Sequence, residues 1–382
     1  MECFLGDFNL SNQNYWKLCL REKARPRIFN YSEIVAFTVA YSVVCTFGIL
    51  MNASIIYLLS TKPKLRKPQN ILIGNLALSN FLLTVLYIPF LWRPASVGDF
   101  SHNRFLCKLA NAVPGSNIYC STLTISVLAI QRYYTVTAVR FRLYNTMRMA
   151  SVLSVCCLIW IVSIIFSLPY LLSFGLESFK FPKEFAEQFG KSEEVHLLTT
   201  CSFQPAVCRK SGNQTRQEAK RCVVMYDAMV SAAQAVFLCL IPLLTLTVFN
   251  FRLSQFLSKR EQRYSSQDHG TFLKTSAICS VDKRRAANKM LMLMFGSYAL
   301  LWMPFVVLSL FIHLFHTYTW RESTVSIVMQ LDESFKLLSL TSTCVNPIIY
   351  GYLNRNFWRE ISITMSKLSF RMATAFSRSP RV

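Results

Sequence analysis

Hydrophobic and polar positions separate along this chain into whole segments instead of alternating within them. Apolar residues collect in long runs, and each run reaches the length of about 20 residues that a helix needs to cross a bilayer. Short stretches rich in polar and charged residues join the runs. The pattern predicts an all-α membrane protein, a seven-transmembrane helix bundle. The predicted spans cover about 34–59, 70–92, 105–138, 149–173, 226–251, 288–315 and 324–352.

Composition and charge support this topology. Hydrophobic residues make up 53% of the 382 residues, more than an ordinary soluble domain contains, and the net charge is +22. Lys and Arg gather at 60–70, 139–148 and 252–289 and in the tail after 353. The positive-inside rule places these stretches in the cytoplasm and the N-terminus outside. Charge spread over short loops argues for attraction to the lipid bilayer and against nucleic-acid binding.

The last span ends with a motif that suits a moving helix, Asn346-Pro347-Ile348-Ile349-Tyr350. Pro347 removes a backbone donor and kinks the helix. Asn346 can hydrogen-bond the freed backbone groups or a neighbouring helix, which matters in lipid. A membrane-helix proline with chance neighbours is the alternative interpretation.

Other spans carry polar or bulky residues at critical depths. Arg132 closes span three in Gln131-Arg132-Tyr133, where a charge at membrane depth indicates function or a snorkelling interfacial side chain. In span six, Trp302 stands half a turn before Pro304 and can act as a pivot beside the expected kink.

Three asparagines lie near mid-membrane on three different helices: Asn52, Asn80 and Asn346. Mutual hydrogen bonding would satisfy them at the lowest cost, so we expect a polar core there.

In order and spacing, one set of residues resembles the rhodopsin-like (class A) G-protein-coupled receptors over about 34–366. The landmarks are Asn52, Asn80, Arg132, Trp160, Pro242, Trp302 with Pro304, and Asn346-Pro347 with Tyr350. The chain looks most like invertebrate neuropeptide receptors of the neuropeptide Y/F or tachykinin type. The resemblance implies a multi-pass plasma-membrane receptor that activates heterotrimeric G proteins, with arrestin as a candidate partner.

The resemblance also implies roles and boundaries. Arg132 and Tyr133 would meet the G protein, Trp302 and Pro304 would form the toggle below the ligand, and Asn346, Pro347 and Tyr350 would form the hinge. Residues 1–33 would be an extracellular tail, 34–353 the seven-helix receptor domain, and 354–382 a short amphipathic eighth helix and cytoplasmic tail.

Six of the 13 cysteines and three sequons fall on the expected outer side. The resemblance implies that Cys107 pairs with a cysteine of the second outer loop, and Cys201 lies in the segment with the best strand character. Cys208–Cys222 and Cys3–Cys19 would then be further bridges, although connectivity cannot be derived from sequence. Candidate glycosylation sites are Asn9, Asn30 and Asn213.

Three positions depart from the family pattern. Gln131 replaces the acid that usually precedes the arginine, Asn80 replaces the carboxylate of span two, and Arg284 stands where many relatives carry an acid. Without a carboxylate beside Arg132 we expect higher basal signalling. With a neutral amide at Asn80 we expect a weak sodium pocket.

The expected ligand pocket includes Asn111, Pro114, Asn117, Asp332 and Lys336. Monoamine receptors carry an aspartate at the position of Pro114, and opsins carry a lysine at the position of Leu340, so both ligand classes are disfavoured. Acids in the outer loops favour a basic peptide, including amidated Arg-Phe types.

Other functions stay open at this point. One is a chemosensory or orphan receptor for a small molecule, and another, of a different class, is a seven-helix transporter or channel. The spans lack the central ion-relay charges and the internal repeat that such a transporter would need. No motif indicates an enzyme, a cofactor or a metal site.

Overall fold

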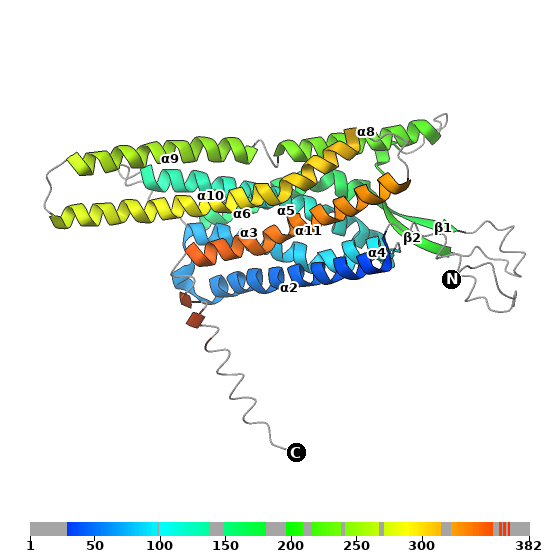
Figure 1. Cartoon of the computed structure of the whole chain (residues 1–382), viewed down its shortest axis with the longest axis horizontal. Coiled ribbons are helices and arrows are strands. Elements are labelled where there is room, and N and C mark those ends of the chain that lie inside the picture. The colour runs from blue at the N-terminus through cyan, green and yellow to red at the C-terminus, as the bar shows by residue number, and fades with distance from the viewer. Residues whose placement is uncertain are drawn as a thin grey trace, which may run out of the picture.

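The computed structural model describes residues 29–97, 99–137, 149–180, 196–208, 216–237, 241–266, 271–314 and 322–353, with 359–360, 362–363 and 366. Long helices run side by side through the molecule, and a small β-hairpin lies at one end (Figure 1). Helices α9 and α10 project beyond the others at the opposite end (Figure 1).

Six of the predicted spans correspond to one long helix each, and the fifth is divided between two helices. The helices are α2 (Tyr31–Thr61), α3 (Pro68–Tyr87), α5 (Arg104–Thr137), α6 (Met149–Ser173), α8 (Arg216–Ala235), α9 (Ile241–Ser266), α10 (Thr271–Leu314) and α11 (Glu322–Leu353). Helix α3 continues through a π-helical turn, η2 (Ile88–Trp92), into α4 (Arg93–Val97). Helices α8 and α9 lie end to end and together occupy the place of span five (Figure 1).

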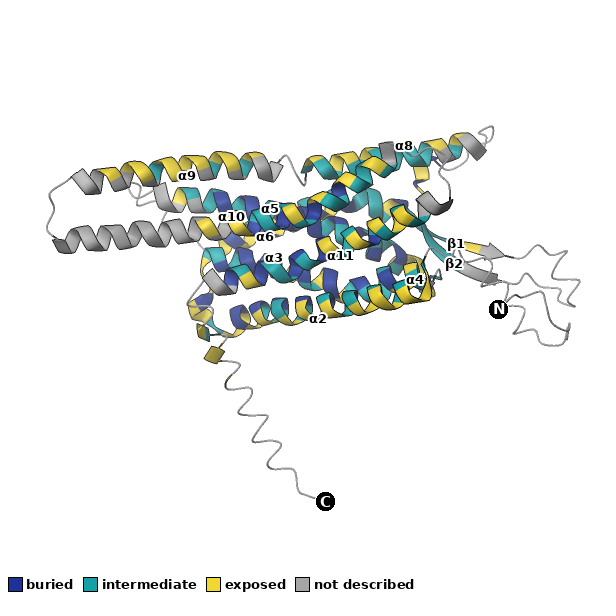
Figure 2. Cartoon of the chain, in the orientation of Figure 1, coloured by how far each residue is buried: buried dark blue, intermediate teal, exposed yellow. Residues whose placement is uncertain are grey.

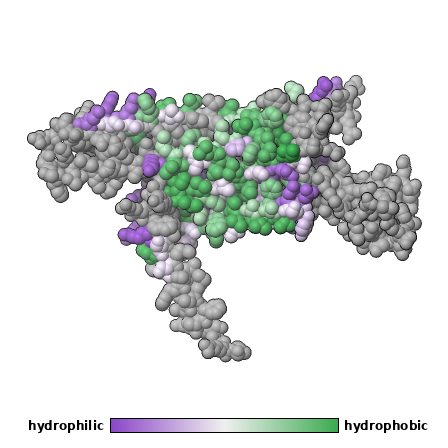
Figure 3. Space-filling model, viewed as in Figure 1, coloured by the Kyte–Doolittle hydropathy of each residue, from purple (hydrophilic) through white to green (hydrophobic). Residues whose placement is uncertain are grey.

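Apolar surface covers the middle of the bundle on the face seen in Figure 3, as a membrane protein requires. Five described segments are long and apolar enough to cross a membrane: α2, Pro68–Ser96, Arg104–Gln131, α6 and Met292–Ile312 of α10. On α2 the exposed apolar residues recur every three or four positions and therefore face one side: Val35, Val39, Val43, Phe47 and Leu50. This stripe faces lipid.

Buried residues gather on the faces of the helices that point into the bundle (Figure 2). The central cluster joins α2, α3, α5, α6, α10 and α11 and includes Leu76, Leu128, Met294, Trp302 and Tyr350. Helix α2 approaches its neighbours closely at Gly48, where an added Cβ would lie 2.7 Å from Cγ2 of Thr84 and 3.0 Å from Oγ1 of Thr343. Small residues allow such close approach in membranes, where packing provides much of the association energy.

The hairpin follows α6 directly. Strand β1 (Phe174–Lys180) pairs antiparallel with β2 (His196–Phe203), and Leu176 lies opposite Cys201. The strand expected around Cys201 is therefore confirmed. Strand β1 was not predicted, because its apolar residues continue the hydrophobic run of the preceding helix.

Candidate functional site: an outer cavity above a polar core

A cavity of about 760 Å³ opens among the helices at the hairpin end of the bundle. Its volume lies within the range of small-molecule pockets and also suits the end of a peptide. Every helix from α3 to α11 except α9 contributes a described lining residue. Representative members are Tyr87, Pro114, Tyr170, Asp227, Trp302 and Lys336.

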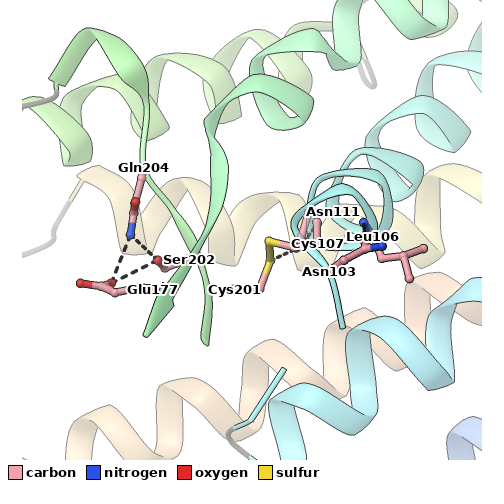
Figure 4. Close-up of a disulfide and its surroundings, with 8 residues drawn as sticks. All are labelled: Asn103, Leu106, Cys107, Asn111, Glu177, Cys201, Ser202 and Gln204. Atoms are coloured by element: carbon pink, nitrogen blue, oxygen red, sulfur yellow. Dashed lines mark hydrogen bonds between the residues drawn. A yellow bond between two sulfur atoms is a disulfide. The ribbon is translucent and has the colours of Figure 1, made fainter. Parts of the chain in front are cut away.

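The hairpin is fastened over this cavity by a disulfide between Cys107 on α5 and Cys201 on β2, the pair that the resemblance implied (Figure 4). Asn111, one turn along α5, donates from Nδ2 to the carbonyl oxygen of Cys107 at 2.9 Å and to Sγ of Cys201 at 3.2 Å. Asn111 therefore both lines the cavity and holds its roof.

A second disulfide joins Cys208, just after the hairpin, to Cys222 on α8. The bridge suggested for these two cysteines is thereby confirmed, and the loop over the cavity is tied to a second helix. Cys3 and Cys19 lie outside the described residues, so their pairing stays a prediction.

Trp302 forms the floor of the cavity. Its side chain is buried, its Nε1 donates to Oγ of Ser342 on α11 at 3.1 Å, and its ring lies 5.7 Å from that of Tyr298 and 6.2 Å from that of Phe305. Pro304 lies two residues further along α10. A ligand pressing on Trp302 would therefore act on α10 and α11 together.

Below Trp302, Pro347 interrupts the hydrogen bonding of α11. Because proline has no N–H, the carbonyl of Thr343 one turn earlier loses its helical donor. Asn52 on α2 supplies a substitute, donating from Nδ2 to this carbonyl at 2.9 Å and to that of Gly48 at 2.7 Å. The freed group that Asn346 was expected to satisfy is thus satisfied by Asn52 from another helix.

The polar core differs from the expected ring of three asparagines. Oδ1 of Asn80 accepts a hydrogen bond from Nδ2 of Asn117 on α5 at 3.1 Å, and Asn117 also donates to Ser79. Asn52 is occupied with backbone carbonyls, so the described bonds do not join Asn52, Asn80 and Asn346 to one another. Oδ1 of Asn52 and Asn346 and Nδ2 of Asn80 are buried without a hydrogen-bond partner among the described residues.

Asn117 also corrects the predicted ligand pocket. Asn111, Pro114, Asp332 and Lys336 line the cavity among the described residues, but Asn117 does not. It lies one turn of α5 deeper than Pro114 and is almost fully buried against α3. Helical spacing placed it on the right face but could not give the depth of the cavity floor.

Sequence reasoning overlooked a cluster at the side of the cavity. Tyr41 on α2 donates its hydroxyl to Oε2 of Glu333 on α11 at 2.9 Å, and the hydroxyl of Tyr87 on α3 lies 3.4 Å from that of Tyr41. Lys336 contacts both Glu333 and Asp332. Both tyrosines stand inside apolar runs. Only their distance along the run from the middle of each helix could have indicated that they lie near the polar end.

A second overlooked contact lies on the lipid side of the core. Asn75 on α3 accepts a hydrogen bond from Nε1 of Trp160 on α6 at 2.8 Å and donates to Oγ1 of Thr124 on α5 at 3.0 Å. One amide thus links three helices and gives the landmark Trp160 a polar partner.

The end of the bundle away from the hairpin is described only in part. The side chains of Arg132, Pro242 and Arg284 lie outside the described residues, as do Asn9, Asn213 and most of the expected eighth helix. Tyr133 packs near Leu253 and lies 5.4 Å from the ring of Phe249 on α9. Tyr350 is buried in the central cluster, and Asn30 is exposed just before α2.

The described residues contain no group of three or more His, Cys, Asp or Glu arranged to hold a metal ion. The described lining of the cavity combines aromatic, amide and charged side chains, which suit recognition of a ligand.

Comparison with known proteins identifies a matching family and several similar receptors. Residues 51–192 and 195–350 match the family described as "7 transmembrane receptor (rhodopsin family)". "Probable G-protein coupled receptor npr-8" of Caenorhabditis elegans is 34% identical over 368 residues, covering 88% of this chain and 73% of that receptor.

Two mammalian receptors are more distant but equally extensive matches. "Neuropeptide Y receptor type 4" of Mus musculus is 24% identical over 359 residues, which is 92% of this chain and 82% of that receptor. "Neuropeptide Y receptor type 6" of Oryctolagus cuniculus is 25% identical over 332 residues, which is 86% and 80%.

Proposed function

The chain belongs to the rhodopsin family of seven-transmembrane receptors, and we propose that it is a plasma-membrane receptor that binds an extracellular neuropeptide and activates heterotrimeric G proteins. The family is one of receptors and not of enzymes. The single observation that carries the ligand proposal is the acidic cavity above Trp302, in a chain whose matched relatives include receptors named for neuropeptide Y.

The walls of the cavity favour a ligand with cationic groups. Asp99, Asp227, Asp332 and Glu333 line it, against the single lysine Lys336 among the described lining residues. Opposite charges on a ligand and its site steer association and suppress wrong partners. The cavity volume admits the end of a peptide, while the hairpin and outer loops offer surface for the rest.

The proposed orientation puts the hairpin end outside the cell. Both described disulfides, Cys107–Cys201 and Cys208–Cys222, lie at that end, and disulfides persist in oxidising, extracellular surroundings. The basic stretch at 60–70 and the described basic residues of α9 lie toward the other end, as the positive-inside rule requires of a cytoplasmic face. Residues 1–33 are then an extracellular tail, and 354–382 are cytoplasmic.

At the inner end we assign G-protein contact to Arg132 and Tyr133. Trp302, Pro304, Asn346, Pro347 and Tyr350 would transmit the movement from the cavity to this surface. The support is a continuous path: Trp302 bonds to α11 at Ser342, and Thr343 next to it is held by Asn52 beside the proline kink.

The test is a second-messenger assay in cells that express the receptor, challenged with a neuropeptide library and with small metabolites. We expect basic peptides to activate, and alanine at Trp302 to abolish the response at equal surface expression. Activation by small metabolites alone would favour the chemosensory alternative. Ion flux without G-protein activation would overturn the receptor mechanism.

A further inference from the structure

The charged cluster on α11 has an unusual arrangement at the cavity wall. Nζ of Lys336 lies 2.7 Å from Oδ2 of Asp332 and 2.8 Å from Oε1 of Glu333. All three side chains line the cavity. The lysine side chain remains 34% exposed, so it reaches the ligand space and is not sealed within the helix packing.

The two carboxylates differ in how many of their oxygens already have a described partner. Glu333 is 10% exposed, and both its oxygens are used, one by Lys336 and the other by the hydroxyl of Tyr41. Asp332 is more exposed, at 17%, and Lys336 is its one described partner, through Oδ2. Asp332 therefore retains an oxygen that can accept from a ligand.

The charge of the described cavity lining determines which ligand group is attracted. The cluster carries one ammonium and two carboxylates, and the described cavity lining carries two further acids, Asp99 and Asp227. An anionic ligand group approaching Lys336 would meet an excess of negative charge. A cationic group would be attracted, and its competitor for Asp332 is the protein's own lysine.

We propose that Asp332 is a subsite for a guanidinium or ammonium group of the ligand and that Lys336 is an internal cation which this group displaces. The inference rests on the proposed function, because it assumes that the ligand occupies this cavity. On displacement Lys336 keeps its bond to Glu333, so no buried carboxylate is left without a partner. A guanidinium suits the vacated position well, since it can engage both oxygens of Asp332.

One consequence separates this arrangement from an ordinary binding residue. Removing a residue that contacts the ligand weakens binding, whereas removing a competing cation strengthens it. Lys336→Met should therefore raise the affinity for a guanidinium group by about tenfold, a typical scale for one partly buried ion pair.

The experiment uses the purified full-length receptor in lipid nanodiscs and measures thermal stabilisation against probe concentration. The probes are Nα-acetyl-arginine amide and its uncharged analogue Nα-acetyl-citrulline amide. In Lys336→Met we expect the arginine probe to gain about tenfold in apparent affinity and the citrulline probe to stay unchanged. Asp332→Asn should remove the preference for arginine.

Lys108→Met is the matched control, because it removes one positive charge from α5 at a position that does not line the cavity. It should leave both probes unaffected. Lys336→Gln repeats the test with a polar side chain if the methionine variant folds poorly, and Asp332→Asn tests the subsite independently of Lys336.

Weaker arginine binding in Lys336→Met, or an unchanged preference in Asp332→Asn, overturns the proposal. The outcome is separable from the receptor assay. If no peptide activates the receptor but Lys336→Met still gains affinity for the arginine probe, only the proposed function is refuted. If peptides activate the receptor but that gain is missing, only the proposed subsite is refuted.

Discussion

Replacing Gly48 with alanine tests how closely α2 must approach its neighbours. The new Cβ would lie 2.7 Å from Cγ2 of Thr84 on α3 and 3.0 Å from Oγ1 of Thr343 on α11. Neither threonine can turn away easily, because the hydroxyl of Thr84 bonds to the carbonyl of Asn80 and that of Thr343 bonds to the carbonyl of Leu340. The helices must therefore move apart.

The cost follows from this geometry. Adding a methyl group to a well-packed core costs about 1–3 kcal/mol, and the better helix propensity of alanine returns up to about 1 kcal/mol. Separation of α2 from α11 also stretches the bond from Asn52 to the carbonyl of Thr343, now 2.9 Å. We expect a net loss of about 1–3 kcal/mol, which lowers the Tm by roughly 1–4 °C in a chain of this size.

The assay is thermal unfolding of the purified receptor, with Gly296→Ala as the matched control. Nothing lies within 4 Å of a Cβ added at Gly296, so that variant should be neutral or slightly more stable. Thr84→Ser removes the clashing methyl group and should recover about half of the loss in the double variant. Equal shifts for Gly48→Ala and Gly296→Ala would refute the reasoning.

Three further experiments test the polar contacts. Tyr41→Phe and Glu333→Gln should show a coupling of about 1.5–3 kcal/mol in a double-mutant cycle of thermal stability, because Tyr41→Phe removes a hydrogen-bond donor from the buried carboxylate of Glu333. Strictly additive effects would contradict this coupling. Gln131→Asp should lower basal second-messenger signalling by restoring a carboxylate beside Arg132, and unchanged basal signalling at equal expression would reject the idea. Asn80→Asp keeps the oxygen that accepts from Asn117 and should make agonist affinity depend on sodium. Strong sodium dependence of the unaltered receptor would contradict the expected weak sodium pocket.

The apolar runs predicted the bundle because hydrocarbon imposes its own length on each helix. They could not predict where helices continue beyond the membrane. Helix α10 begins at Thr271, before the run that starts at 288, and α9 continues to Ser266, past the end of the run at 251. Outside the membrane a helix needs no apolar run, so hydropathy marks neither the start of α10 nor the end of α9. Only the structure shows these extensions.

The landmark residues were found because each breaks the apolar pattern or the helix itself. Their partners were harder to predict. Asn52 was identified as a core residue, but its bond to Thr343 depends on which carbonyl Pro347 frees and on the close approach at Gly48. Tyr41 was missed because a tyrosine in an apolar run looks like any other large residue until its hydroxyl is seen against Glu333.

The two disulfides have a consequence for the route by which a ligand arrives. The segment from Cys201 to Cys208 is a strap fastened to α5 at one end and to α8 at the other. It can bend, but it cannot swing clear of the cavity. No described disulfide crosses the α11 wall of the cavity, so access is easiest there. Asp332 and Lys336 line that wall, so they should influence the rate at which a cationic ligand associates as well as its affinity.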